Sequence, residues 1–186
     1  VETGARVVVP EDFWQEMVEA LPPGGPEGAA AFLLCHGPYM SRIPVYMVRF
    51  LTRALVSGRS PELYLYLDGV HAGHEGQRPS EFANIGRAVF DLDTSARARN
   101  RLSWFGACSR CATARGYYVQ NLSTGSCESS GVIPAVTVRP LREILGRFLL
   151  SHPVLSHGCG GLGGARNGGA GVPRLVVCLT MAPYLA

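Results

Sequence analysis

Two cysteines and an arginine have the spacing of one helical face in the segment 108–116, which reads C-S-R-C-A-T-A-R-G. Cys108 and Cys111 are three residues apart, and Cys111 and Arg115 are four apart, so on a helix the three side chains share a face. A thiol at a helix start lies near the positive end of the backbone dipole, and a neighbouring guanidinium adds positive charge. Both effects favour the thiolate, which is the nucleophilic form of cysteine. The spacing therefore predicts a reactive thiol at Cys108.

This segment follows an apolar run at 102–107 that predicts a buried strand, and Gly116 suits the left-handed position that ends a helix. Similar apolar runs predict four more strands, at 30–35, 62–67, 133–138 and 174–180. The predicted helices are 41–57, 80–101, which is expected to be broken or irregular near Asp91–Asp93, and 141–150. Because strands alternate with helices, we expect an α/β fold: a single three-layer domain with a mainly parallel five-stranded sheet.

Polar residues follow the ends of these strands. His36, Asp68, His71 and Cys108 all lie at such positions. Ligands and chemistry sit at the carboxyl ends of the strands in open parallel sheets, so we expect one shared site. His36 is a candidate to move protons or to hydrogen-bond the sulfur, and the alternative is that it only caps backbone groups of its turn. His71 and His74 are further candidates in a longer loop, whereas Asp68 is expected to fix its Asp-Gly turn.

The two ends of the chain differ from this core. Residues 1–28 are interpreted as an N-terminal extension, and the α/β domain is expected to cover 29–186 with a glycine-rich insertion at about 152–173. Within the insertion, the segment 158–163 matches the dinucleotide-binding fingerprint by letter. The glycines and the proline that follow exclude the helix whose start must hold the phosphate. We therefore interpret the insertion as a loop and expect no cofactor.

Composition narrows the function classes. All 17 basic residues are arginines, which excludes a Schiff-base lysine and a phosphate-loop lysine. The net charge is only +3 and the arginines are scattered, so no basic stripe for nucleic acid is present. No apolar run reaches the roughly 18 to 20 residues of a membrane span, and no secretory leader is evident. We expect a cytoplasmic protein that binds neither nucleic acid nor a membrane.

Zinc binding and thioredoxin-like chemistry are two alternatives for the cysteine pair. Zinc would need further ligands such as Cys127, His71 or Cys159, but no second CxxC or paired histidines occur at metal spacing, so we expect no metal. Thioredoxin-like proteins also have CxxC at a helix start. The intervening Ser109 and Arg110 and the strand pattern do not resemble that family.

The chain resembles the DsrE/DsrF-like family, which includes the TusD sulfur-relay proteins. Three segments carry the resemblance: C-x-x-C-x-x-A-R-G at 108–116, L-Y-L-D-G-V at 65–70, and the end of the first core helix, R-A-L-V-S-G, at 53–58. The similarity covers roughly residues 30–150 and the last strand. The N-terminal extension and the glycine-rich insertion depart from the family pattern.

The resemblance implies a five-stranded α/β domain that usually assembles into trimers or hexamers. It also implies a cysteine that carries sulfur as a persulfide, and the position of that cysteine, eight residues before the glycine of the Arg-Gly pair, is Cys108. Cys111 would either resolve a persulfide or disulfide at Cys108 or pack inward. Arg115 would either lower the pKa of the thiol or form a surface ion pair.

The function that follows from the resemblance is a sulfur carrier of sulfurtransferase type, with sulfur donor and acceptor proteins as partners. The alternative is a non-catalytic oligomeric binding module that keeps the family fold.

Overall fold

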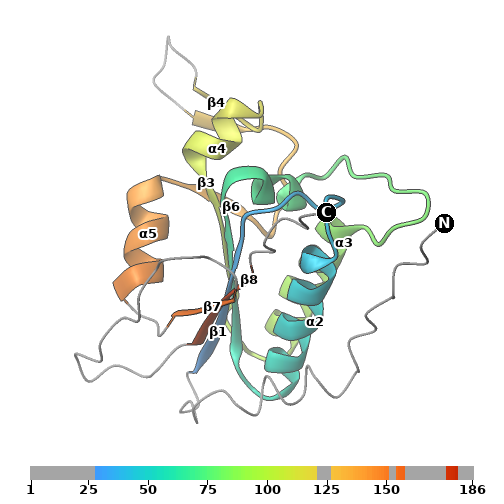
Figure 1. Ribbon diagram of the computed structural model, residues 1–186, viewed down its shortest axis with the longest axis vertical. Coiled ribbons are helices and arrows are strands. Elements are labelled where there is room, and N and C mark those ends of the chain that lie inside the picture. The colour runs from blue at the N-terminus through green and yellow to red at the C-terminus, as the bar shows by residue number, and fades with distance from the viewer. Residues whose placement is uncertain (1–27, 121–126, 151–153, 158–174, 180–186) are drawn as a thin grey trace, which may run out of the picture.

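The computed structural model of the chain describes residues 28–120, 127–150, 154–157 and 175–179 (Figure 1). Its centre is a six-stranded sheet in the order β6–β3–β2–β1–β8–β7, in which every pair of neighbouring strands is parallel. The strands are β1 (Ala29–Leu34), β2 (Ser60–Leu65), β3 (Trp104–Cys108), β6 (Thr137–Arg139), β7 (Val154–His157) and β8 (Leu175–Leu179). The predicted α/β class with a mainly parallel sheet is confirmed.

The sheet has one strand more than the five that we expected. The additional strand, β7, pairs in parallel with β8 and lies at the start of the segment interpreted as a glycine-rich loop. Its four residues are too few to stand out beside the glycines that follow. The expected N-terminal extension, and the glycines that follow β7, lie outside the described residues.

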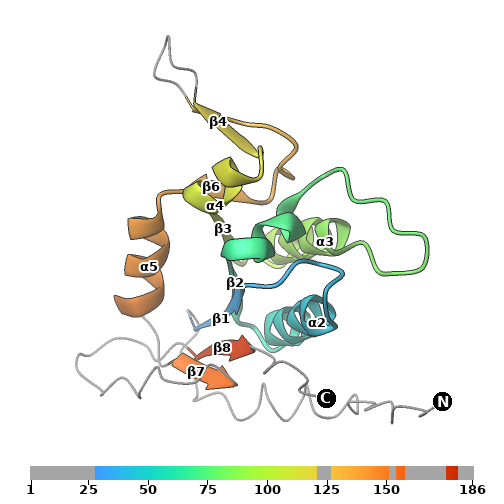
Figure 2. The same ribbon diagram turned by 45° about the horizontal axis from the view of Figure 1, so that its top comes forward.

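Helices cover both faces of the sheet (Figures 1 and 2). On one face lie α2 (Ile43–Val56) and α3 (Ile85–Ala98), and the main apolar core fills the space between them and the strands. Phe32 of β1 and Phe50 of α2 meet in this core with their ring centroids 6.1 Å apart. The opposite face carries α5 (Leu141–Leu150), the helix predicted after Pro140. No helix among the described residues is long and apolar enough to cross a bilayer.

A charged cluster fastens α5 to the sheet. Glu62 of β2 is only 3% exposed and accepts hydrogen bonds from the Tyr64 hydroxyl at 2.8 Å and from the Arg147 guanidinium at 2.7 Å. The guanidinium also lies over the Trp104 ring, 4.8 Å from its centroid. Burial is the main cause that raises the pKa of Tyr64 far above its usual value, and the charge of Glu62 raises it further. The buried carboxylate therefore has both a cation and a hydroxyl as partners.

The helix predicted at 80–101 differs in length and continuity. It begins only after Asn84, whose side-chain oxygen accepts a hydrogen bond from the Arg87 N–H at 2.8 Å and so caps the first turn. It then runs without a break to Ala98. The predicted break near Asp91–Asp93 is therefore wrong.

Two ion pairs explain why these acids do not interrupt α3. Asp91 pairs with Arg87, and Asp93 pairs with Arg97, each at 2.9 Å and one helical turn away. Pairs of opposite charge at this spacing stabilise a helix and offset the weak helix propensity of aspartate.

The predicted strand at 133–138 is shorter than expected. A turn closes between Ile133 and Val136, where the Val136 N–H donates to the Ile133 carbonyl at 3.0 Å, and β6 begins at Thr137. Pro134 lies inside this turn and has no N–H to give to a sheet ladder.

Short elements lie at the carboxyl edge of the sheet. The 3-10 helix η1 (Leu67–Gly73) follows β2 directly, and α4 (Ser109–Ala114) follows β3 directly. Gly116 has a φ of 74°, so the left-handed residue that we expected does end α4. Beyond it, β4 (Tyr118–Gln120) and β5 (Cys127–Ser129) form an antiparallel pair. The loop after β1, η1 after β2 and α4 after β3 therefore lie side by side at this edge, because the three strands are adjacent and parallel.

Candidate functional site

The order of the strands brings the predicted site residues to one edge of the sheet. Because β1, β2 and β3 are adjacent and parallel, the segments that leave their carboxyl ends are neighbours. His36 follows β1, Asp68 and His71 lie in η1, and Cys108 is the last residue of β3. The shared edge that the sequence predicted for these residues is present.

The two cysteines meet at the junction of β3 and α4. Cys108 is 0% exposed and Cys111, in the first turn of α4, is 9% exposed. Neither forms a disulfide, and they are close enough that Cys108 raises the pKa of the Cys111 thiol. β3 is an interior strand, and both side chains belong to the main apolar core, so neither thiol is open to solvent in the isolated chain. A sulfur carrier needs an exposed thiolate, so the burial differs from our expectation. The sequence could not predict it, because it did not indicate which face the two side chains would take.

The electrostatic surroundings of Cys111 oppose thiolate formation. Burial raises the pKa of its thiol, and the hydrogen bond and charge of Cys108 raise it further. A hydrogen bond from the backbone of Leu67 acts in the opposite direction, and the positive charge of Arg115 adds a smaller effect of the same sign. In the resting chain, desolvation outweighs both of these stabilising contacts at Cys111.

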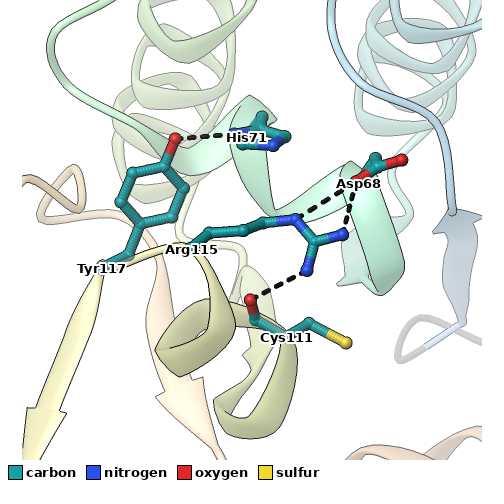
Figure 3. Close-up of polar contacts among 5 residues, drawn as sticks. All are labelled: Asp68, His71, Cys111, Arg115 and Tyr117. Atoms are coloured by element: carbon teal, nitrogen blue, oxygen red, sulfur yellow. Dashed lines mark hydrogen bonds and ion pairs between the residues drawn. The ribbon is translucent and has the colours of Figure 1, made fainter.

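Arg115 forms an ion pair, which is one of the two roles that the sequence left open. Its Nε donates to Asp68 Oδ1 at 3.1 Å, its Nη2 also binds that oxygen, and its Nη1 donates to the Cys111 carbonyl oxygen at 3.1 Å (Figure 3). Hydrogen bonding from Arg115 lowers the pKa of Asp68. Asp68 therefore does more than fix its turn, because through Arg115 it ties η1 to α4.

A tyrosine between two histidines forms the second part of the site. The Tyr117 hydroxyl and His71 Nδ1 are 2.6 Å apart, and the Tyr117 ring stacks on His74 with centroids 4.8 Å apart (Figure 3). Burial lowers the pKa of His71, and the charge of Arg115 lowers it further, whereas Asp68 opposes the shift. His71 is thus neutral near pH 7 and able to accept a proton. Sequence reasoning missed Tyr117, and its only signal was an aromatic residue directly after Gly116.

A groove with a volume of about 860 Å³ opens beside these residues. Asp68, His71, His74 and Tyr117 line one part of it. The remaining lining residues come from the loop after β1 and from the loop before α3: Gly37, Pro38, Tyr39, Met40, Gly76, Gln77, Arg78, Pro79, Ser80 and Phe82. The two cysteines are not among them. Arg115 connects the groove and Cys111, because it binds Asp68 in the groove wall and the Cys111 carbonyl oxygen.

His36 directly precedes Gly37 of the groove lining and influences Asp68 through its charge. Its charge contributes to lowering the pKa of Asp68. Its Nδ1 is buried and has no hydrogen-bond partner in the described part of the chain. No group of three or more His, Cys, Asp or Glu residues in that part could hold a metal ion. Of the other zinc ligands considered, Cys159 lies outside the described residues.

No family model matches this chain, and the proteins similar to it include one solved structure and one curated relative. The crystal structure of the YchN protein from E. coli aligns with a TM-score of 0.50 at 21% sequence identity, over 81% of this chain and 98% of YchN. The likeness supports a DsrE-like fold. The uncharacterized protein MK0008 of Methanopyrus kandleri is 29% identical over 104 residues, which cover 55% of this chain and 81% of that protein.

Proposed function

We propose that this protein carries sulfane sulfur as a persulfide on Cys108, with Cys111 as the assisting thiol. The observation that carries this proposal is the pair of free cysteines at the carboxyl end of β3 and in the first turn of α4. That edge is where open parallel sheets hold their chemistry. The DsrE-like fold adds support, because the family motif assigns the sulfur to the position of Cys108.

The loading step is a thiol exchange that needs no external oxidant. The Cys108 thiolate attacks the outer sulfur of a donor persulfide, so a bond forms between Cys108 Sγ and that sulfur. The bond between the two donor sulfurs breaks, and the donor leaves as a thiolate that takes up the proton from Cys108. One donor persulfide and one Cys108 thiol thus become one donor thiol and one Cys108 persulfide.

Access to Cys108 requires a local movement, since this thiol is buried. Elements that open locally have few buried contacts and short hydrogen-bonded runs, and α4 with its six residues fits this description. Asp68 and Arg115 hold α4 against η1. We propose that release of this ion pair opens the path to the thiols, and that donor and acceptor proteins approach from the side of the groove.

A second function, a non-catalytic oligomeric binding module, is favoured by a different observation. Both thiols are covered, whereas the groove beside them is open and rich in aromatic rings. Grooves of this size and lining are typical of small-molecule sites. In this alternative the cysteines only fill the core, and the groove is the functional surface.

Sulfur loading separates the two functions. The reduced full chain is incubated with inorganic polysulfide, excess reagent is removed, and the intact mass is measured before and after treatment with a reductant. A carrier gains the mass of sulfur in a form that the reductant removes, and Cys108→Ser loses that gain. Cys35→Ser is the matched control, because Cys35 is a partly exposed cysteine that forms no disulfide and lies outside the motif. No adduct, or an adduct that persists in Cys108→Ser, supports the binding module instead.

A further inference from the structure

The side-chain amide of Gln77 fastens the walls of the groove to one another. Its nitrogen donates to the carbonyl oxygens of His71 at 2.9 Å and of His74 at 3.1 Å, at the end of η1. Its oxygen accepts from the Tyr39 hydroxyl at 3.0 Å and from the Gly86 N–H at 3.1 Å. One amide thus joins the loop after β1, η1 and the start of α3. A groove held in this way is formed before a ligand arrives, which spares the ligand the cost of ordering it.

One part of the groove is lined by exposed aromatic rings. Tyr39 and Phe82 come from different loops, and their ring centroids lie 6.1 Å apart. They are 43% and 69% exposed, and Met40 beside Tyr39 is 70% exposed. Large apolar side chains that gather at a concave surface mark a ligand site, and flat rings of a ligand stack on aromatic side chains.

Asp68 supplies a free hydrogen-bond acceptor in another part of the groove. Both contacts from Arg115 go to Asp68 Oδ1, so Oδ2 has no hydrogen-bond partner in the described part of the chain. This second oxygen lies on the side of the carboxylate away from Arg115 (Figure 3). His71 follows three residues later in η1, and side chains at that spacing in a 3-10 helix lie one above the other. Asp68 and His71 therefore share a face of η1.

His71 adds a free donor beside this acceptor. Its Nδ1 lies 2.6 Å from the Tyr117 hydroxyl, which has no other hydrogen-bond partner among the described residues. Burial raises the pKa of Tyr117, so the phenol keeps its hydrogen near pH 7 and donates it to Nδ1. The hydrogen of the neutral imidazole is thereby assigned to Nε2. Within the same residues Nε2 has no partner of its own.

We propose that the groove binds a planar heteroaromatic ring with a hydrogen-bond donor beside an acceptor, the edge that purine-type bases present. The ligand donor binds Asp68 Oδ2, and its acceptor takes the hydrogen of His71 Nε2. The ring stacks on Tyr39 and Phe82. Gln77 brings these parts within reach of one ligand, because it alone separates the Tyr39 hydroxyl from the His71 carbonyl. The volume of about 860 Å³ leaves room for a substituent on the ring.

The probe for this site is 2-aminopurine, which is fluorescent and has an amino donor next to a ring-nitrogen acceptor. Stacking on aromatic side chains quenches its emission, so titration with the full chain should give saturable quenching. Phe82→Ala should raise the Kd at least about fivefold, because it removes one stacking ring. The matched control is Leu102→Ala, which truncates an 86% exposed leucine outside the groove and should leave the Kd unchanged. No quenching, or equal Kd values for the two variants, overturns the proposal.

The hydrogen-bonding edge is tested at Asp68. Asp68→Asn replaces an acceptor with an N–H that opposes the ligand donor, so the Kd should rise about tenfold. This substitution also weakens the link to Arg115, and Arg115→Met is the control, because it breaks the same link and keeps both carboxylate oxygens. We expect Arg115→Met to bind far more tightly than Asp68→Asn. Equal weakening by both variants would assign the effect to loosening of η1 and contradict the role of Oδ2.

Competition tests the chemistry of the ligand. Adenine, which has the paired edge, should displace 2-aminopurine, whereas indole at the same concentration should displace much less, because its N–H has no acceptor beside it. Equal displacement by the two rings would reduce the site to an apolar groove and overturn the proposal.

The groove site does not depend on sulfur carriage. Cys108→Ser removes the proposed sulfur carrier, and it should bind 2-aminopurine with the wild-type Kd. Binding without a persulfide contradicts only the proposed function, and a persulfide without binding contradicts only the groove site.

Discussion

The ion pair between Arg147 and Glu62 is the contact whose loss has the most predictable cost. Arg147→Met keeps a long apolar side chain over Trp104 and removes the cation that pairs with Glu62. The carboxylate is only 3% exposed and cannot regain this partner from water. Its other hydrogen bond, from the Tyr64 hydroxyl, stays in place.

Two features of the pair set the size of the expected effect. Removing one partner of a fully buried ion pair costs about 3 to 5 kcal/mol. The Arg147 side chain is 35% exposed, so part of its attraction to Glu62 is already screened by solvent. With the Tyr64 hydroxyl still bound, we expect Arg147→Met to lower the free energy of unfolding by about 2 to 3 kcal/mol.

Urea unfolding of the full chain, followed by far-UV circular dichroism, measures this change. The control is Arg87→Met, which removes an arginine from an exposed pair with Asp91 and should cost about 0.5 kcal/mol or less. Combining Glu62→Gln with Arg147→Met removes the buried charge that has lost its arginine, so the double variant should be more stable than Arg147→Met alone. A cost of Arg147→Met no larger than that of Arg87→Met would refute this account of the pair.

Three further predictions concern the site and the assembly. Asp68→Asn weakens the link between η1 and α4 and leaves Arg115 nearer to the thiol as a free charge, so Cys111 should be alkylated faster than wild type at pH 7; an unchanged rate contradicts the role given to the ion pair. His71 has a lowered pKa, so the unfolded chain binds its proton more readily, and stability should fall as the pH drops below about 6.5, the ordinary value. Urea midpoints at pH 7.5 and 5.5 should therefore differ less in His71→Gln than in wild type, and an equal difference would count against this assignment. The family resemblance predicts a homo-oligomer, a trimer or hexamer, and light scattering that gives a monomer mass at micromolar concentration would exclude it.

Much of the fold follows from local patterns in the sequence. Strands that are buried on both faces are continuous apolar runs, and this is how β1, β2 and β3 were found. The end of α4 was predicted for a similar reason, because Gly116 is suited to the left-handed position that it occupies. Alternation of these strands with helices then gave the parallel sheet and the edge that carries the site.

The expected break in α3 and the expected sheet without β7 differ from the structure, because local patterns do not show which contacts a residue makes. Asp91 and Asp93 weaken a helix by propensity, yet arginines one turn away stabilise them in place. β7 is too short to be recognised beside a glycine-rich segment, and it depends on pairing with β8. Such strands are determined by their neighbours more than by their own sequence.

The side-chain contacts within the site could not be predicted from the spacing of residues in the sequence. Asp68 and Arg115 are 47 residues apart, and His71 and Tyr117 are 46 apart, so only the packing of η1 against α4 joins them. The burial of Cys108 depends on which face of β3 its side chain takes, and an apolar run without alternation does not indicate a face.

The bond from Arg115 to the Cys111 carbonyl has a consequence for oxidative damage. Arg115 reaches from Asp68, at the wall of the groove, to the Cys111 carbonyl oxygen (Figure 3), and the side chains of Cys108 and Cys111 are both buried. Water-borne peroxide attacks thiolates that are exposed, and further oxidation to sulfinic and sulfonic acids is irreversible for most proteins. Burial would thus keep both cysteines out of reach of peroxide in the chain at rest, and only the opening of α4 proposed above would expose them.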